Sequence, residues 1–367
     1  MKILSIVGAR PNFMKVAPLH RAFLAYPDME SKIVHTGQHH DFMMSGIFFE
    51  QLQIPKPDCF LNVNGGTHAQ QTGRIMLAFE KVVLTENPDL IVVVGDVNST
   101  LACGLVAVKM HIPVAHVEAG LRSGDRNMPE EINRILTDAI SDQLFVTEHS
   151  AMKNLLLENV HPARIHLVGN TMIDSLVHCE SHINACDIVA ELGLAANTYI
   201  VITMHRPANV DNQGGLTNLL EVGKCLSRHL KVVFSVHPRT LKNINAFGME
   251  QDFQAIENLI MIASLGYFEF IRLIKNAALV ITDSGGIQEE TTFLQIPCIT
   301  LRNNTERPVT ISEGTNHLLP DFTAESVAQL AEKILSGKSK RSGIPEYWDG
   351  KAAERISRIL REKYINS

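Results

Sequence analysis

The sequence predicts an α/β fold made of two doubly wound domains that face a central cleft. Short runs rich in Val and Ile recur along the 367 residues, and each run is followed by a turn signal and a helical stretch. Runs that are apolar on both faces and alternate with helices indicate parallel sheets covered on both sides. The runs form two series, and a chain of this length is comfortable for two domains.

The two series give the expected strands and the boundary between the domains. In the first half we expect strands at 3–7, 32–36, 90–94, 113–117, 143–146 and 165–168. In the second half we expect strands at 199–203, 231–236, 259–262, 279–282 and 298–301. We therefore predict domains over 1–172 and 173–351, followed by an amphipathic helix over 352–365.

Composition and charge exclude several classes of protein. Hydrophobic residues make up 45% and charged residues 20%, as in an ordinary soluble protein. The net charge of −6 argues against a nucleic-acid partner, because phosphate backbones are bound by clustered Lys and Arg. No apolar stretch approaches the roughly 20 residues that span a bilayer, and the start lacks the apolar core of a signal peptide. With six scattered cysteines, which we expect to be reduced, the sequence predicts a cytoplasmic protein without a membrane partner.

Charged and glycine residues collect at the carboxyl ends of the expected strands. Ligands of open parallel sheets bind beyond these ends. In the first half the end segments include 8–10, 95–96 and 118–120, and in the second half 205–206, 237–239 and 283–286. We therefore expect a local binding site at the strand ends, and this site rather than net charge must hold any phosphate group.

A Ser-Gly-Gly turn between an expected strand and helix is the first candidate site. Ser284, Gly285 and Gly286 would let backbone N–H groups approach a phosphate, which a helix N-terminus also favours. Glu290 lies one turn into that helix and could accept hydrogen bonds from ribose hydroxyls, while Arg307 could neutralise the phosphate. A tight turn capped by Ser284 is the alternative, but the two features together favour a nucleoside diphosphate.

A second candidate anion site follows the first expected strand. Arg10 and Lys15 straddle a loop-to-helix junction, so both can face an anion above the sheet. A surface salt bridge is the alternative for Arg10.

The Gly-x-Gly-x-x-Gly fingerprint of dinucleotide binding is absent from the sequence, and we expect the protein to need no cofactor.

Three carboxylates form the candidate catalytic set. Asp96 and Glu118 end two successive strands, and Glu131 follows on an expected helix. Close carboxylates push their pKa values apart and can then serve as acid and base. Isolated strand-end carboxylates more often cap helices or pair with Arg, and for Glu130 we expect an ion pair with Arg134, four residues on.

Two histidines end strands in the second half of the chain. His205 and His237 each lie near Pro and Arg, and a strand-end histidine can stabilise phosphate or move a proton near neutral pH. A single histidine in this position is more often structural, but the pair favours ligand contact. His35 and His39 are separated by a strand end and a glycine turn rather than by a helix, so we expect no metal site there.

Together these segments resemble the non-hydrolysing UDP-N-acetylglucosamine 2-epimerase family, which has the glycosyltransferase-B-type fold of two Rossmann-like domains. The matching pieces occur in family order and cover nearly the whole chain. They are the segments 8–15, 36–39, 95–96, 116–122, 129–134, 169–174, 205–206, 283–290 and 305–308. In this fold the final helix crosses back, which implies that 352–367 packs on the first domain.

The resemblance implies roles for individual residues. Asp96, Glu118 and Glu131 resemble the catalytic carboxylates of the family, with His205 close to the departing diphosphate. The residues that resemble its UDP-binding residues are Arg10, Lys15, His205, Ser284, Gly285, Gly286, Glu290 and Arg307, with Phe270 as a uracil contact.

The family also suggests a regulatory site and an assembly. Its members can bind a second substrate molecule beside the active site, and Gln38, Arg206 and His237 lie in the matching segments. The alternative is that Arg206 and His237 serve only the active site. We expect the protein to be a homodimer with a UDP-sugar substrate.

The resemblance also implies a reaction path. Inverting C2 of a UDP-sugar requires removal of a hydrogen from an unactivated carbon. Since the dinucleotide fingerprint is absent, the implied path expels UDP from C1 while a carboxylate takes the C2 proton, and UDP then adds back to the glycal-type alkene. This path needs a base, an acid and groups that stabilise the departing diphosphate.

The identity of the sugar stays open at this point. Where many family members have Glu this chain has Ala208 and Val309, and Leu265 replaces a Gln of some members. A UDP-N-acetyl sugar with a different N-acyl or C6 group is therefore an alternative substrate. A hydrolysing 2-epimerase, a glycosyltransferase of the same fold and a sensor that binds without turnover are the alternative functions.

Overall fold

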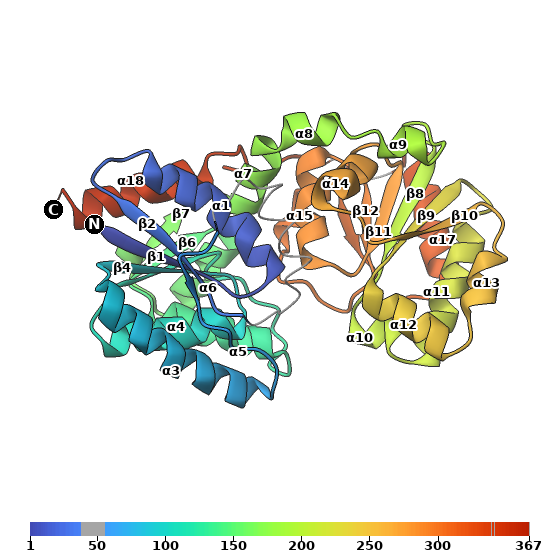
Figure 1. Ribbon diagram of the computed structural model, residues 1–367. Helices are drawn as coiled ribbons and strands as arrows, with labels where there is room; N and C mark the ends of the chain where they lie inside the picture. The colour runs from blue at the N-terminus through green and yellow to red at the C-terminus, as the bar shows by residue number, and fades with distance from the viewer. Residues whose placement is uncertain (38–55, 339, 341, 367) are drawn as a thin grey trace. The chain divides into compact units, whose positions relative to one another are not determined.

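The computed structural model describes residues 1–37, 56–338, 340 and 342–366, without the side chain of Arg10. The chain divides into two compact units (Figure 1). Unit 1 comprises Met1–His178 and Glu346–Ser367, and unit 2 comprises Cys179–Pro345. The functional domains expected over 1–172 and 173–351, with 352–367 returning to the first, stay a prediction.

The described part of unit 1 contains a seven-stranded parallel sheet in the order β3-β2-β1-β4-β5-β6-β7. Its strands are β1 (Lys2–Val7), β2 (Glu30–His35), β3 (Cys59–Phe60), β4 (Leu90–Val94), β5 (Val114–Val117), β6 (Gln143–Val146) and β7 (Ile165–Leu167). The six expected strands are confirmed. The two-residue β3 was missed, because so short a run carries no periodic signal.

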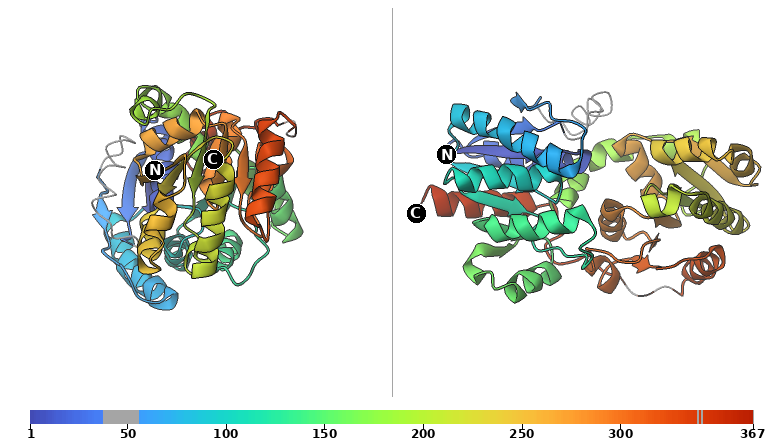
Figure 2. Two further views of the ribbon diagram at one scale, coloured as in Figure 1. Left: turned by 90° about the vertical axis from the view of Figure 1, so that its right-hand side faces the viewer. Right: turned by 90° about the horizontal axis from the view of Figure 1, so that it is seen from below.

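Helices cover both faces of this sheet (Figure 1). On one face α1 contacts α7 and α18, and on the other α4 contacts α3 and α5; α3 and α4 run side by side in the view from below (Figure 2). The helices are α1 (Arg10–Leu24), α3 (His68–Glu86), α4 (Asn98–Lys109), α5 (Pro129–Ile140), α6 (His149–Leu157), the 3-10 turn η1 (Pro162–Arg164), α7 (Thr171–His178) and α18 (Ala352–Tyr364).

Unit 2 contains a six-stranded parallel sheet in the order β10-β9-β8-β11-β12-β13 within its described residues. The strands are β8 (Tyr199–Thr203), β9 (Lys231–Val236), β10 (Leu259–Ala263), β11 (Leu279–Thr282), β12 (Cys298–Thr300) and β13 (Asn316–Leu318). The five expected strands are confirmed, and the three-residue β13 was missed.

The helices of unit 2 also form two groups, as Figure 1 shows. On one side α11 contacts α10, α13 and α17, and on the other α14 contacts α8, α9 and α15. The helices are α8 (Glu180–Asn184), α9 (Ile188–Glu191), α10 (Pro207–Val210), α11 (Gln213–Leu226), α12 (Pro238–Ala246), α13 (Glu250–Gln254), α14 (Tyr267–Lys275), α15 (Gly285–Leu294), α16 (Val309–Ser312) and α17 (Ala324–Leu335).

Each sheet reverses its strand order at one place, which is where a doubly wound fold opens a crevice for ligands. In unit 1 the reversal lies at the paired strands β1 and β4, and in unit 2 at β8 and β11. The strand order therefore locates the binding crevice of each unit before any side chain is considered.

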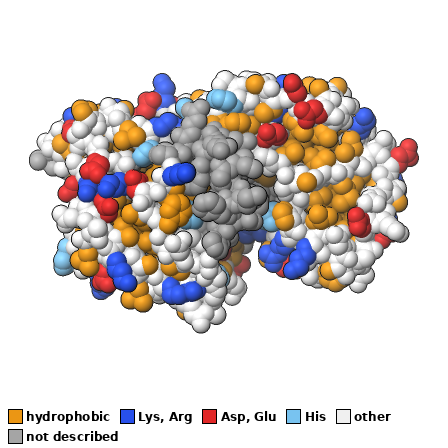
Figure 3. Space-filling model, viewed as in Figure 1, with side chains coloured by type: hydrophobic (Ala, Val, Ile, Leu, Met, Phe, Trp, Pro, Cys, Tyr) orange, Lys and Arg blue, Asp and Glu red, His pale blue; other side chains and the backbone are white. Residues whose placement is uncertain are grey.

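Two observations bear on the possible partners: the charges on one face of the protein and the length and apolar character of its described helices. On the face shown in Figure 3, Lys and Arg side chains are interspersed with Asp and Glu. Among the helices that the structure describes, none has the length and apolar character needed to cross a bilayer.

A buried carboxylate joins α18 to the rest of unit 1. Asp174 on α7 accepts hydrogen bonds from the backbone N–H groups of Ala352 and Ala353, at 3.1 and 2.7 Å. These are first-turn groups of α18 that have no partner within the helix. Burial raises the pKa of Asp174 to about 6, although both hydrogen bonds favour the ionised form.

We expect Asp174→Ala to lower the free energy of unfolding by about 1 kcal/mol, the usual cost of losing a side chain that caps a helix N-terminus. Chemical denaturation at neutral pH measures this change. The control is Asp349→Ala, which removes an exposed partner of Arg355 and should matter less. An Asp174→Ala protein as stable as the parent would contradict the capping role.

Candidate active site

The loop after β1 is fastened to the end of β4. Asn12 Oδ1 accepts from the backbone N–H groups of Gly8 and Ala9, at 3.0 and 2.8 Å, and Asn12 Nδ2 donates to the carbonyl oxygen of Val94. A side chain at Gly8 would overlap Ser99, so only glycine fits this approach. The start of α1, which carries the predicted anion-binding residues, is therefore fixed over the reversal point.

Lys15 and Glu118 meet at this point. Lys15 Nζ lies 2.6 Å from Glu118 Oε2, and the two side chains are only 6% and 4% exposed. The sequence predicted both residues at the site but gave them separate roles. The structure brings them together as a buried ion pair, so Lys15 already has a negative partner.

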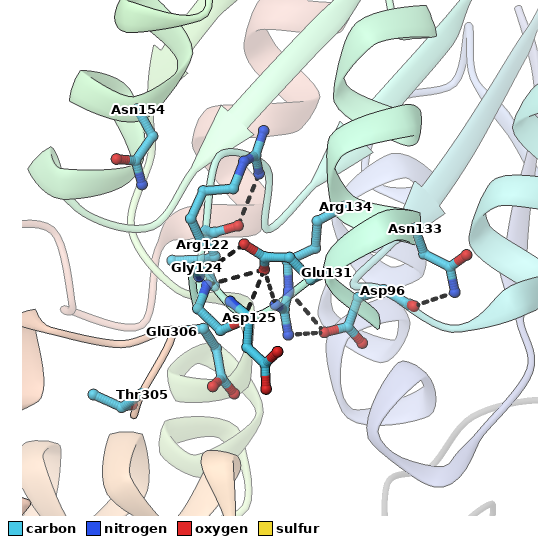
Figure 4. A network of polar contacts seen from close by, with 12 residues as sticks. Asp96, Arg122, Gly124, Asp125, Glu131, Asn133, Arg134, Asn154, Thr305 and Glu306 are labelled. Carbon is cyan, nitrogen blue, oxygen red and sulfur yellow. Dashed lines mark hydrogen bonds and ion pairs between the residues drawn. The ribbon is translucent and has the colours of Figure 1, made fainter. Parts of the chain in front are cut away.

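Arg134 joins the other two predicted carboxylates (Figure 4). Its Nη2 lies 2.6 Å from Asp96 Oδ2, and its Nη1 lies 2.7 Å from Glu131 Oε2. Asn133 Nδ2 also donates to the backbone oxygen of Asp96. Arg134 thus meets these two carboxylates on the buried side of α5, and the Glu130–Arg134 ion pair stays an untested alternative.

Glu131 is held by more donors than either other carboxylate. Its oxygens accept from the N–H groups of Ser123 and Gly124 at 2.9 Å each, from Ser123 Oγ at 3.0 Å, and from Arg134. Burial raises the pKa of Glu131, but these hydrogen bonds outweigh it and the net shift is downward. Glu131 is therefore an ionised group that also fixes the loop at 123–124.

In unit 2 a buried carboxylate at the end of β11 organises the end of β8. Asp283 accepts from the backbone N–H groups of His205 and Arg206 and from Asn209 Nδ2. Its Oδ1 also lies 3.1 Å from His205 Nδ1. Burial alone would raise the pKa of Asp283, but the hydrogen bond from His205 and the other donors lower it. His205 is thus oriented through Nδ1, which leaves Nε2 for a ligand.

The predicted phosphate turn lies at the N-terminus of α15. Ser284 is the residue that precedes the helix, and its side chain makes no capping hydrogen bond. Gly285 and Gly286 begin the first turn, whose N–H groups have no acceptor within the helix. The helix start therefore has the donors and the positive dipole end that an anion needs.

Arg307 lies against this turn but is not an uncompensated cation. Arg307 Nε lies 2.9 Å from Glu289 Oε1, and Nη1 contacts Glu306, which also pairs with Arg302 at 2.9 Å. A Cβ added to Gly285 would come within 2.8 Å of Arg307 Nη1. The missing side chain of Gly285 thus makes room for this buried charge cluster.

Glu290 lies on α15. Burial and the charge of Glu289 raise its pKa to about 8, against the opposing effect of the Tyr267 hydroxyl. Glu290 is therefore a neutral acid near pH 7, which the sequence did not indicate. Phe270 lies half-buried on α14, which contacts α15.

The structure describes some of the residues of the predicted regulatory site, and their regulatory role stays a prediction. His237 Nδ1 accepts from the N–H of Arg239 at 3.2 Å, so His237 caps α12, and its ring centroid lies 5.3 Å from that of His205. The N–H of Arg206 is bound by Asp283. Gln38 lies outside the described residues, as does the side chain of Arg10. Within the described ranges no three His, Cys, Asp or Glu side chains are grouped as a metal site requires.

Sequence reasoning missed two organising carboxylates, Asp138 and Asp283. Asp138 accepts from the Gly120 N–H and lies 2.7 Å from both Arg122 Nη1 and His116 Nδ1. The signal for Asp138 was its helical spacing from Glu131, seven residues earlier on the same buried face of α5. The signal for Asp283 was its place directly after an apolar strand.

The two Rossmann-like sheets define a protein of the glycosyltransferase-B fold class. The model of the family described as UDP-N-acetylglucosamine 2-epimerase matches residues 21–361. This chain therefore belongs to the UDP-N-acetylglucosamine 2-epimerase family.

Individual relatives cover nearly the whole chain. The UDP-N-acetylglucosamine 2-epimerase of Methanocaldococcus jannaschii is 43% identical over 366 residues, which cover 98% of this chain and 99% of that protein. The UDP-2,3-diacetamido-2,3-dideoxy-D-glucuronate 2-epimerase of Pseudomonas aeruginosa is 41% identical over 364 residues, with coverage of 98% and 99%. A crystal structure of the M. jannaschii enzyme in complex with UDP-GlcNAc and UDP matches with a TM-score of 0.89 at 43% identity, over 98% of this chain and 99% of that one.

We expect the stabilising contribution of Glu131 to disappear in acid. The folded pKa lies below the ordinary value of 4.5, so the ionised group stabilises the fold above pH 4.5 and loses this effect as the pH falls through the folded pKa. Glu131→Gln should therefore lower the free energy of unfolding near neutral pH by about 1–3 kcal/mol.

The measurement is chemical denaturation of both proteins across the acid range. The difference between wild type and Glu131→Gln should shrink as the pH falls below 4.5. The control is Glu130→Gln, a half-buried neighbour on α5, which should change stability little. A difference that stays constant with pH would show that Glu131 is not the ionised group described.

Proposed function

We propose that this chain interconverts UDP-N-acetylglucosamine and UDP-N-acetylmannosamine by inverting C2 of the sugar. The relatives above are named as 2-epimerases of UDP-sugars, and one was solved with UDP-GlcNAc and UDP. The observation that carries the proposal is the set of carboxylates paired with cations at the strand ends of unit 1. A C2 epimerase needs such groups to take a proton and return one.

The strand ends of unit 2 are proposed to hold UDP. The first-turn N–H groups at Gly285 and Gly286 would bind the diphosphate beside Ser284, whose own N–H donates to Thr282 Oγ1 at 3.0 Å. His205 Nε2 would lie beside the bond that breaks. Arg307 already faces two carboxylates, so it adds little net charge. We therefore expect the helix N-terminus and His205 to provide most of the attraction from unit 2.

Further contacts to the nucleotide are carried over from the sequence analysis as proposals. Phe270 would lie against uracil, and Glu290 would bind the ribose hydroxyls. A neutral Glu290 can donate one hydrogen bond and accept others, which suits hydroxyl groups that do both. UDP contacts by Arg10 and Lys15 are also kept as proposals, although Lys15 is already paired with Glu118.

The proposed chemistry is an elimination followed by an addition. A carboxylate takes the C2 proton, the C2–H electron pair forms the C1–C2 double bond, and the C1–O bond breaks with its pair going to UDP. The second carboxylic acid then protonates C2 from the opposite face while a UDP oxygen re-forms the bond to C1. The atoms and charges balance without an oxidant or reductant.

The environments of the three carboxylates differ in a way that bears on these steps. Glu118 faces the Lys15 ammonium, and Asp96 faces Arg134 through Oδ2 while its side chain is 23% exposed. Both can exchange a proton with a bound sugar. Glu131 is surrounded by donors, so proton uptake by Glu131 would break several hydrogen bonds. Its predicted catalytic role is retained here as a proposal to be tested beside the other two.

We expect Asp96→Asn, Glu118→Gln and Glu131→Gln each to reduce kcat by about 10²–10⁴-fold, the usual contribution of general acid–base catalysis. The affinity for UDP, measured by calorimetry, should change little because these residues lie in unit 1. Glu130→Gln, on the same helix as Glu131, should keep parental turnover. Near-normal turnover in Glu131→Gln would reassign this residue to holding the loop at 123–124.

The experiment that tests the function is incubation with UDP-N-acetylglucosamine without added cofactor, followed by separation of the products. Appearance of UDP-N-acetylmannosamine supports the proposal. Free N-acetylmannosamine with UDP would show a hydrolysing epimerase, transfer to an added acceptor would show a glycosyltransferase, and binding without product would show a sensor.

A second candidate substrate is the UDP-2,3-diacetamido-2,3-dideoxy-D-glucuronate of the P. aeruginosa relative. The similar identities of the two relatives, 43% and 41%, favour its inclusion. So do Ala208 and Val309, where many family members have Glu, and Leu265, where some have Gln. Comparing kcat/KM for the two sugars decides between them. Regulation by a second substrate molecule, a homodimer and a cytoplasmic location stay predictions.

A further inference from the structure

A second buried charge network lies beside the proposed catalytic carboxylates in unit 1. Asp138 on α5 is 1% exposed and faces three donors. Its Oδ1 lies 2.7 Å from His116 Nδ1, and its Oδ2 accepts from the Gly120 N–H at 3.0 Å and contacts Arg122 Nη1 at 2.7 Å. None of these four residues is one of the proposed acids or bases.

Both nitrogens of the His116 ring face acceptors. Nδ1 faces the Asp138 carboxylate, and Nε2 lies 2.8 Å from the carbonyl oxygen of Gly95. Burial alone would raise the pKa of Asp138, but the charge of His116 and then Arg122 lower it, so this carboxylate is ionised. The His116 ring therefore links the Asp138 carboxylate to the backbone at Gly95.

The network spans two loops that meet at the crevice. Gly95 directly precedes Asp96, and Gly120 follows Glu118 by two residues. Both glycines have positive φ, +68° and +78°, and a side chain at Gly120 would overlap the carbonyl oxygen of Ala151. The ring of His116 holds the first loop by its carbonyl group, and Asp138 holds the second by its N–H group.

Arg122 also fixes the second loop, which contains Gly120. Its Nε and Nη2 donate to Glu158 at 2.8 and 2.6 Å, and its Nη1 donates to the carbonyl oxygen of Leu121. The side chains of Asp138, Arg122 and Glu158 face one another and the backbone. The network therefore acts by fixing backbone and not by attracting substrate.

We propose that Asp138 is a positioning residue for epimerisation, and that it acts through His116, Arg122 and the Gly120 amide to set the spacing between Asp96 and Glu118. This role rests on the proposed function. A base and an acid on opposite faces of one carbon must hold their separation, and a misplacement of about 1 Å can cost 10²-fold in rate. The alternative is that Asp138 only stabilises the fold.

The test compares Asp138→Asn, which acts beyond the carboxyl end of β5, with a matched control at the start of β5. Asp142 Oδ2 accepts from the N–H of Val114 at 2.8 Å, where β5 begins and away from the crevice. Asp142→Asn removes a comparable carboxylate–backbone contact. For both variants, kcat, KM, UDP affinity and melting temperature are measured beside wild type.

We expect Asp138→Asn to lower kcat by about 10²-fold while KM and UDP affinity stay near parental values. Asp142→Asn should keep the parental kcat even where its melting temperature falls. Parental kcat in Asp138→Asn, or equal losses of kcat in both variants, would overturn the positioning role. Absence of turnover in wild type would instead overturn the proposed function, so the two failures are distinguishable.

A second variant covers the case in which Asp138→Asn does not fold. His116→Gln breaks the link between Asp138 and the carbonyl oxygen of Gly95. We expect it to lower kcat by about 10²-fold with KM near the parental value, and a parental kcat would overturn the proposal.

Discussion

Ionised carboxylates that accept backbone N–H groups hold the loops on which this site depends. Asp138 and Glu131 bind the loop after β5, and Asp283 binds the loop after β8. Each of these carboxylates is buried, and each also faces an Arg or His side chain. Removing one partner of a buried ion pair typically costs about 3–5 kcal/mol, because the other charge is left without compensation. The loops therefore cannot relax without losing several interactions at once.

Ion pairs with carboxylates also limit how strongly the Lys and Arg side chains of the site can attract a phosphate. Lys15 and Arg307 were anion-binding candidates in the sequence analysis, yet each faces carboxylates in the folded chain, as Arg134 also does. Their charges orient neighbouring groups more than they attract a phosphate. The N-terminus of α15 and the half-exposed His205 are different. The first-turn N–H groups of α15 have no acceptor within the helix, and His205 meets Asp283 through Nδ1 and its backbone N–H, which leaves Nε2. This division suits a catalyst whose polar groups are arranged before substrate arrives.

The sequence was sufficient to predict the alternating strands and helices of the two sheets. Apolar runs of four to six residues gave the strands, and the rule for parallel sheets placed Asp96, Glu118 and His205 at carboxyl ends. Strands β3 and β13 were missed because β3 has only two residues and β13, Asn-His-Leu, contains no apolar run. The pattern of apolar residues therefore predicts strands that are continuous apolar runs and gives no signal for strands that lack such a run.

Side-chain partners were harder to predict than positions. Helical spacing allowed Arg134 to meet Glu130, but it also allowed Glu131, and only the fold shows that Arg134 lies on the buried side with Asp96. Asp138 was missed for the same reason, since its partners come from other elements. Protonation was equally hidden: the neutral Glu290 results from burial beside Glu289, and neither is visible in a linear sequence.

The central claim is that carboxylates fixed at these strand ends take the C2 proton of the sugar and return one from the other face. Its most direct test is the reaction in heavy water, with the product analysed by NMR and mass spectrometry. The account predicts that UDP-N-acetylmannosamine formed by the wild-type protein carries solvent deuterium at C2. A product that keeps all of its original C2 hydrogen would contradict the account, because no carboxylate would then have exchanged that proton.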